Sequence, residues 1–130
     1  MITADLALRL RSAGVEWTPL PGDRFIIPNT DLAGEVFVIS DMTIEAHETP
    51  GGPIIRFNGT TEWALDSIEA ARVLWLPRED QLRSLLGERF VRLEAMSGGF
   101  AVVVIDGGRF VDIDPERAYA RAVLGHPQAV

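Results

Sequence analysis

The sequence has 130 residues, 47% of them hydrophobic and 24% charged, and its formal net charge is −7. These values are typical of a single soluble globular domain and exclude a chain that is disordered over most of its length. The acidic charge argues against nucleic acid as a partner, because it repels phosphates. Cysteine is absent, which excludes disulfides, cysteine-based zinc sites and a thiol nucleophile.

The N-terminal segment predicts a helix over residues 3–13. Thr3 is suited to cap this helix, Asp5 lies in its first turn, and Gly14 ends it. In residues 15–28, two short runs of β-forming residues flank the segment Thr-Pro-Leu-Pro-Gly-Asp. This pattern predicts a hairpin or an irregular ribbon, since the prolines disfavour regular pairing.

A long antiparallel hairpin is predicted in the centre of the chain. Residues 35–47 alternate between apolar and polar, and Pro50 and Gly51 are suited to the corners of a turn. Folding the chain there places Glu45 opposite Arg56, an attractive pair. The other pairs of this register are Ala46 with Ile55, Ile44 with Phe57, Met42 with Gly59, Ser40 with Thr61, Val38 with Trp63, Thr43 with Asn58 and Asp41 with Thr60. A bulged turn would shift the register by one residue, and both alternatives stay open.

The segment after this hairpin contains one ambiguous stretch and one clear helix. Residues 68–75 fit either a short helix or a connector that carries Leu74 and Trp75 into the core. The helix is predicted to have Pro77 at its first position and to end at Gly87. Its expected apolar face consists of Leu82, Leu85 and Leu86.

The last third of the chain predicts a meander followed by a helix. Glycine-containing turns separate three expected strands, over residues 89–96, 99–106 and 109–113. The run from Ala101 to Ile105 is entirely apolar, so this strand is expected to be central and covered on both faces. Asp114 is suited to cap a closing helix that starts at Pro115 and ends at Leu124.

Together these elements predict an α+β fold. Its antiparallel sheet would be built from two hairpin or meander units and covered by about three helices, one N-terminal, one in the middle and one C-terminal. We expect a single domain over residues 1–125 and a mobile tail over residues 126–130.

Polar residues on the first strand of the central hairpin are candidates for chemistry. His47 and Glu45 lie two apart and therefore on one face, and a histidine oriented by a carboxylate can act as a general base. Asp41 and Thr43 lie further along the same strand. The alternative, which we favour, is a solvated strand face on which Glu45 pairs with Arg56.

The sequence predicts no catalytic residue, no cofactor and no metal. The second histidine, His126, lies in the tail, and two distant histidines lack the spacing of a zinc site. Asp112 and Asp114 resemble a short acid pair that binds divalent cations, but Asp114 is better explained as a helix cap. Neither a phosphate-binding glycine loop nor a serine nucleophile elbow is present.

The chain contains three tryptophans, Trp17, Trp63 and Trp75. Packing in the core is the explanation we favour for them. The alternative is that Trp63, near the end of the hairpin and followed by Asp66, anchors a partner, since tryptophan is enriched at binding hot spots. The candidate binding surface therefore consists of Trp63, Asp66, Asp41, Glu45, His47 and Arg56.

Several stretches of the sequence resemble a known family. They are FNGTTEWALDS at 57–67, LWLPREDQLRSLLG at 74–87, GGFAVVV at 98–104 and DPERAYARAVL at 114–124. Through them the chain is similar, over most of its length, to a family of small uncharacterised bacterial proteins, some of which are labelled as pilus assembly proteins. The resemblance supplies no catalytic signature that transfers to residues of this chain.

We expect a non-enzymatic module that binds another protein, as immunity proteins and adaptors do. The alternatives are a small-molecule binding protein or hydrolase that uses the polar strand face, and an accessory to pilus or secretion machinery, which the resemblance alone implies. No stretch reaches the roughly 18 apolar residues of a membrane-spanning helix and no secretory signal is present, so we expect a cytoplasmic protein without membrane contact. An exposed hairpin edge would allow pairing with a second copy, and the oligomeric state stays open.

Overall fold

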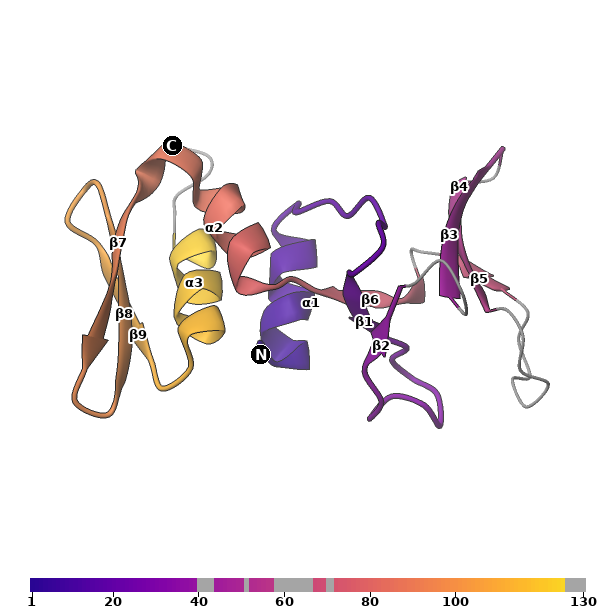
Figure 1. Cartoon of the computed structure of the whole chain (residues 1–130), viewed down its shortest axis with the longest axis horizontal. Helices are drawn as coiled ribbons and strands as arrows, with labels where there is room; N and C mark the ends of the chain where they lie inside the picture. The colour runs from indigo at the N-terminus through magenta and orange to yellow at the C-terminus, as the bar shows by residue number, and fades with distance from the viewer. Residues whose placement is uncertain (40–43, 51, 58–66, 70–71, 126–130) are drawn as a thin grey trace. The chain divides into compact units, whose positions relative to one another are not determined.

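The computed structural model describes residues 1–39, 44–50, 52–57, 67–69 and 72–125. It has the expected α+β fold, with helices and antiparallel three-stranded sheets (Figure 1). The chain divides into two compact units. Unit 1 comprises Met1–Val15 and Pro77–Val130, and unit 2 comprises Glu16–Leu76. The expectation of one domain over residues 1–125 stays a prediction, and the expected tail over 126–130 lies outside the described residues.

Unit 1 consists of a meander with helices on one of its sides (Figure 1). Its elements are α1 (Ala4–Ser12), α2 (Glu79–Leu86), the 3-10 helix η2 (Gly87–Arg89), β7 (Phe90–Met96), β8 (Gly99–Val104), β9 (Arg109–Asp112) and α3 (Pro115–Leu124). The strands pair in the order β7-β8-β9, as predicted for the last third of the chain. Helix α3 packs on β8 and β9, and α1 and α2 pack on α3.

The core of unit 1 is built around the central strand β8. All four residues from Ala101 to Val104 are buried, as expected for a central strand. Ile105 was expected to continue this strand but is 60% exposed, because the strand ends at Val104 and the chain turns towards β9. From the helices, Leu10, Leu82 and Tyr119 contribute fully buried side chains.

The predicted caps of the first and last helices are confirmed. The hydroxyl oxygen of Thr3 accepts a hydrogen bond from the backbone N–H of Leu6 at 3.1 Å. A carboxylate oxygen of Asp114 accepts one from the N–H of Arg117 at 3.0 Å. Each cap satisfies one of the backbone donors that lack partners at the start of a helix.

The predicted start of the middle helix is wrong by two residues. Helix α2 begins at Glu79 with Arg78 as its N-cap residue, so Pro77, predicted as the first helical residue, lies before the helix. The reason is that the backbone N–H of Arg78 donates to the side-chain oxygen of Gln81 at 2.9 Å, which is half of a capping box. Leu85, predicted for the apolar face, is 41% exposed, whereas Leu82 and Leu86 are buried.

Unit 2 contains a small sheet that the sequence did not predict. Its strands are β1 (Arg24–Ile26), β2 (Phe37–Val38) and β6 (Leu74–Leu76), and they pair antiparallel in the order β2-β1-β6. Of the two alternatives predicted for residues 15–28, the regular hairpin is wrong, because β1 pairs with segments that lie further along the chain. The interpretation of residues 68–75 as a helix is also wrong, because this stretch contributes to two strands, β5 (Ser67–Glu69) and β6.

The central hairpin of unit 2 has the predicted register. Strands β3 (Ile44–Thr49), β4 (Gly52–Phe57) and β5 form a second meander. The confirmed pairs are Ile44 with Phe57, Glu45 with Arg56 and Ala46 with Ile55. The bulged turn is thereby excluded. Each of the other five predicted pairs includes at least one residue outside the described part of the chain. Val38, predicted to pair with Trp63, is described and pairs with Arg24 of β1.

Candidate functional site

The residues of the predicted binding surface lie partly outside the described residues. Asp41, Trp63 and Asp66 belong to the segments that the structure does not describe. Glu45 on β3 lies directly opposite Arg56 on β4, as predicted. The structure therefore brings this one pair together and leaves the other members of the surface untested.

The candidate role of His47 as a general base stays a prediction. His47 lies two residues beyond Glu45 on β3, and its partner on β4 is the apolar residue Ile54. Among the described residues, no group of three histidine, aspartate or glutamate side chains is placed to hold a metal ion.

Two of the three tryptophans are partly buried and pack within unit 2. The rings of Trp17 and Trp75 stack with centroids 6.2 Å apart and an interplanar angle of 5°. The indole N–H of Trp17 donates to a carboxylate oxygen of Asp23 at 2.9 Å, and Asp23 is only 3% exposed. Trp17 packs against a buried cluster formed by Phe25, Ile27, Phe37, Ile39 and Val73. The prediction of core packing is confirmed for Trp17 and Trp75, and Trp63 lies outside the described residues.

The acid pair at the end of β9 has a structural role. Asp114 caps α3, and Asp112 forms ion pairs with Arg117 at 3.3 Å and Arg121 at 2.8 Å. Burial by itself raises the pKa of Asp112, but the hydrogen bonds from Arg121 and from the N–H of Asp114, with the charges of Arg117 and Arg121, hold the pKa below its usual value. This carboxylate therefore ties β9 to α3 and stays ionised.

The contacts of Asp112 also establish which side of the meander faces the helices. Asp112 lies opposite Phe100 on β8, so both point towards α3. Because successive side chains of a strand point to opposite faces, the intervening residues of the meander point away from α3. We call this side the open face, and it consists of Arg92, Glu94 and Met96 of β7, Ala101 and Val103 of β8, and Arg109 and Val111 of β9.

A small ion-pair network crosses the open face. The carboxylate of Glu94 forms ion pairs with Arg92 at 3.3 Å and with Arg109 at 3.8 Å. Since Arg92 is on β7 and Arg109 on β9, this network spans the central strand. Val103 lies between the two arginines in the register and is only 9% exposed. The aliphatic stems of the arginines therefore cover a surface that no described helix of unit 1 covers.

Apolar side chains surround this network. Met96 is 39% exposed and Val111 44%. Ile113, immediately after β9 and two residues beyond Val111, is 71% exposed, and we include it in the open face. A guanidinium N–H of Arg109 donates to the sulfur of Met96 at 3.6 Å. Arginine and methionine are among the residues enriched at protein interfaces. The sequence carries a signal for this surface, because Arg92, Glu94 and Met96, and likewise Arg109, Val111 and Ile113, follow one another with the period of two that places them on one face of a strand.

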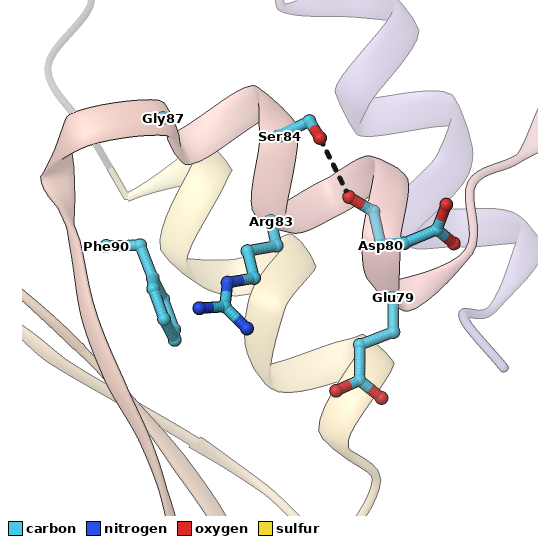
Figure 2. A pocket seen from close by; sticks show the side chains of 6 residues that line it. All are labelled: Glu79, Asp80, Arg83, Ser84, Gly87 and Phe90. Carbon is cyan, nitrogen blue, oxygen red and sulfur yellow. Dashed lines mark hydrogen bonds between the residues drawn. The ribbon is translucent and has the colours of Figure 1, made fainter.

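Unit 1 also has an open hollow beside α2. It is lined by Glu79, Asp80, Arg83, Ser84, Gly87 and Phe90, as Figure 2 shows. The guanidinium carbon of Arg83 lies 4.2 Å from the centroid of the Phe90 ring, a cation–π contact. The hydrogen bond from Arg78 and its charge lower the pKa of Asp80 against the opposing effect of burial. Small-molecule sites are usually enclosed and mostly apolar, so this open and charged hollow does not point to one.

Comparison with known proteins gives no match to a family model, to a curated protein or to a solved structure. The resemblance to a family with members labelled as pilus assembly proteins therefore stays a prediction. Within the described part of the chain, no helix is long and apolar enough to cross a membrane.

Proposed function

We propose that this chain is a non-enzymatic module that binds another protein through the open face of the β7-β8-β9 meander. The observation that carries the proposal is the exposure of Met96, Val111 and Ile113 around the Arg92–Glu94–Arg109 network. Interfaces of this kind combine a few apolar anchors with charged groups at the rim. The immunity- or adaptor-like role and the cytoplasmic location expected from the sequence are part of this proposal.

The charge of the open face supports a partner whose contact region is apolar and acidic. The face has two arginines and one glutamate, although the chain as a whole has a net charge of −7. The net charge of the open face is therefore positive, whereas that of the remaining surface is negative. Charge complementarity sets orientation and association rate more than affinity, so the apolar side chains are expected to supply most of the binding free energy.

The experiment is affinity capture with a matched control. The immobilised chain is compared, as bait for proteins in a cell lysate, with the double variant Val111→Lys/Ile113→Lys and with the control Leu8→Lys/Leu85→Lys. Leu8 and Leu85 are each 41% exposed and lie on α1 and α2, so the control adds the same charge away from the open face. We expect capture by the wild type and the control and its loss in the open-face variant. Equal capture by all three, or no capture by the wild type, would contradict the proposal.

Two other functions predicted from the sequence are kept as alternative proposals. A small-molecule binding protein or hydrolase would use the polar residues of β3 and β4, and its test is the binding of a screened ligand by His47→Ala and Arg56→Ala. Unchanged binding in both variants would exclude it. An accessory role in pilus or secretion machinery rests on the resemblance alone, and neighbouring genes of that machinery would support it.

A further inference from the structure

The edge strand β7 has backbone groups that are free to pair with another strand. In the described part of unit 1, the order of the sheet is β7-β8-β9, so one side of β7 has no neighbouring strand. Ser97 and Gly98 form a two-residue turn between Met96 and Gly99. This geometry requires Met96 and Gly99 to exchange both of their backbone hydrogen bonds.

The alternation of the ladder then determines which groups point outward. The backbone groups of Glu94 and Arg92 are also hydrogen-bonded to β8, because hydrogen-bonded pairs recur at every second residue of an antiparallel ladder. The N–H and C=O groups of Leu93 and Ala95 therefore point to the unpaired side. The bulge between Phe90 and Arg92 ends this regular edge at its N-terminal side.

The sequence of this edge is complementary to itself. If a second copy of β7 pairs antiparallel with Leu93 opposite its counterpart, then Arg92 lies opposite Glu94 of the second copy, and Glu94 lies opposite its Arg92. Two opposite-charge pairs form, one on each side of the two-fold axis. They fall at the non-hydrogen-bonded positions, where side chains of neighbouring strands are closest.

We propose that two copies of this chain associate through their β7 edges in this register. The outward backbone groups of Leu93 form the central hydrogen-bonded pair, and the two meanders join into one continuous antiparallel sheet. The two-fold axis runs perpendicular to this sheet, so both open faces lie on the same side and adjoin each other. Long edge strands with unpaired backbone groups are the usual sites of such pairing. The proposal does not depend on the binding of a partner to the open face.

The charge test uses two single variants and their mixture, studied by sedimentation equilibrium. Arg92→Glu places glutamate opposite glutamate and Glu94→Arg places arginine opposite arginine, so each variant alone is expected to sediment as a monomer. Mixed in equal amounts, the two variants are complementary and are expected to regain the mass of a dimer. A wild type that stays monomeric at millimolar concentration, or single variants that dimerise like the wild type, would overturn the proposal.

The register is tested by cysteine cross-linking, which the absence of native cysteine makes unambiguous. In Leu93→Cys, the two thiols meet at the axis, where the Cα atoms of a hydrogen-bonded pair lie about 5.5 Å apart, within disulfide range. In the control Ala95→Cys, the two cysteines lie four residues apart along the paired strands, roughly 13 Å, and are out of range. Preferential cross-linking of Leu93→Cys supports the register, and equal or no cross-linking in both variants contradicts it.

A backbone variant separates edge pairing from folding. Leu93→Pro removes an N–H that points to the unpaired side, so it breaks no hydrogen bond to β8. Proline is tolerated at such a position of an edge strand. We expect a folded monomer with a circular dichroism spectrum like that of the wild type. A dimer of unchanged affinity would overturn the proposal.

Discussion

Glu94 on β7 and Arg109 on β9 approach to 3.8 Å across the intervening strand β8. In the register, Arg92 and Arg109 flank Val103, which is 9% exposed on a face without a described helix of unit 1. On this face the side chains of Arg92 and Arg109 shield the central strand from solvent, as α3 does on the opposite face of the meander. This arrangement leaves the apolar residues at its margin available for contact.

Arg109→Ala is expected to lower the free energy of unfolding by about 0.5–1 kcal/mol. The ion pair contributes little, because the side chains of Arg109 and Glu94 are 47% and 34% exposed. Most of the loss comes from uncovering Val103. Urea unfolding measures it, and Arg109→Gln, which keeps much of the aliphatic stem, should lose less than the alanine variant. A larger loss in Arg109→Gln would contradict the covering role.

Asp112→Asn is expected to destabilise the chain by about 1–3 kcal/mol at neutral pH, because the side chain is 8% exposed and holds two arginines of α3. The folded-state pKa of Asp112 lies below its usual value of 3.8. Its contribution is therefore complete above that value and is lost as the pH falls through the folded-state pKa.

The measurement for Asp112 is urea unfolding between pH 7 and pH 2. The difference in free energy of unfolding between the wild type and Asp112→Asn should disappear as the pH falls below about 4. Asp80→Asn is the control, because the side chain of Asp80 is 71% exposed, so its lowered pKa should have little effect on stability. A difference between wild type and Asp112→Asn that is constant over this pH range would contradict the assignment.

Gly99→Ala is expected to destabilise the meander by about 1–3 kcal/mol. A Cβ atom at Gly99 would lie 2.6 Å from the backbone oxygen of Asp112, and a backbone atom in a sheet cannot move aside easily. Gly34→Ala is the matched control, since nothing lies within 4 Å of a Cβ at that position. Thermal unfolding compares the two, and equal melting temperatures would show that the meander tolerates the methyl group.

Asp23→Ala is expected to lower the free energy of unfolding by about 1–3 kcal/mol, because it leaves two partly buried N–H donors without their acceptor. The carboxylate of Asp23 accepts from the indole N–H of Trp17 and from the backbone N–H of Leu20. Asp31→Ala, at an exposed position, serves as the control. Urea unfolding followed by tryptophan fluorescence measures the effect, and an unchanged midpoint for Asp23→Ala would contradict it.

Local signals predicted the central hairpin, the C-terminal meander and the caps of α1 and α3. Alternation next to a tight turn was enough to pair Glu45 with Arg56, and a cap residue followed by proline was enough to place the start of α3. The pairing of β1 with β6 was not predictable in the same way. Strands of three residues carry almost no periodic signal, and Phe25 and Trp75 are partners across a long stretch of chain.

The candidate site was harder to predict than the fold. Alternation shows that Arg109 and Val111 share a face of β9, but it does not show which face α3 covers. That choice depends on the contact of Asp112 with Arg121, which joins two elements. The predicted surface around Trp63 and Asp66 lies outside the described residues, so the open face is an additional candidate.

Affinity capture by wild type, Val111→Lys/Ile113→Lys and Leu8→Lys/Leu85→Lys tests the central claim most directly. The account predicts that a protein retained by the wild type is also retained by the control variant and is lost from the open-face variant, while all three melt at similar temperatures. Retention of the same protein by the open-face variant at wild-type level would contradict it.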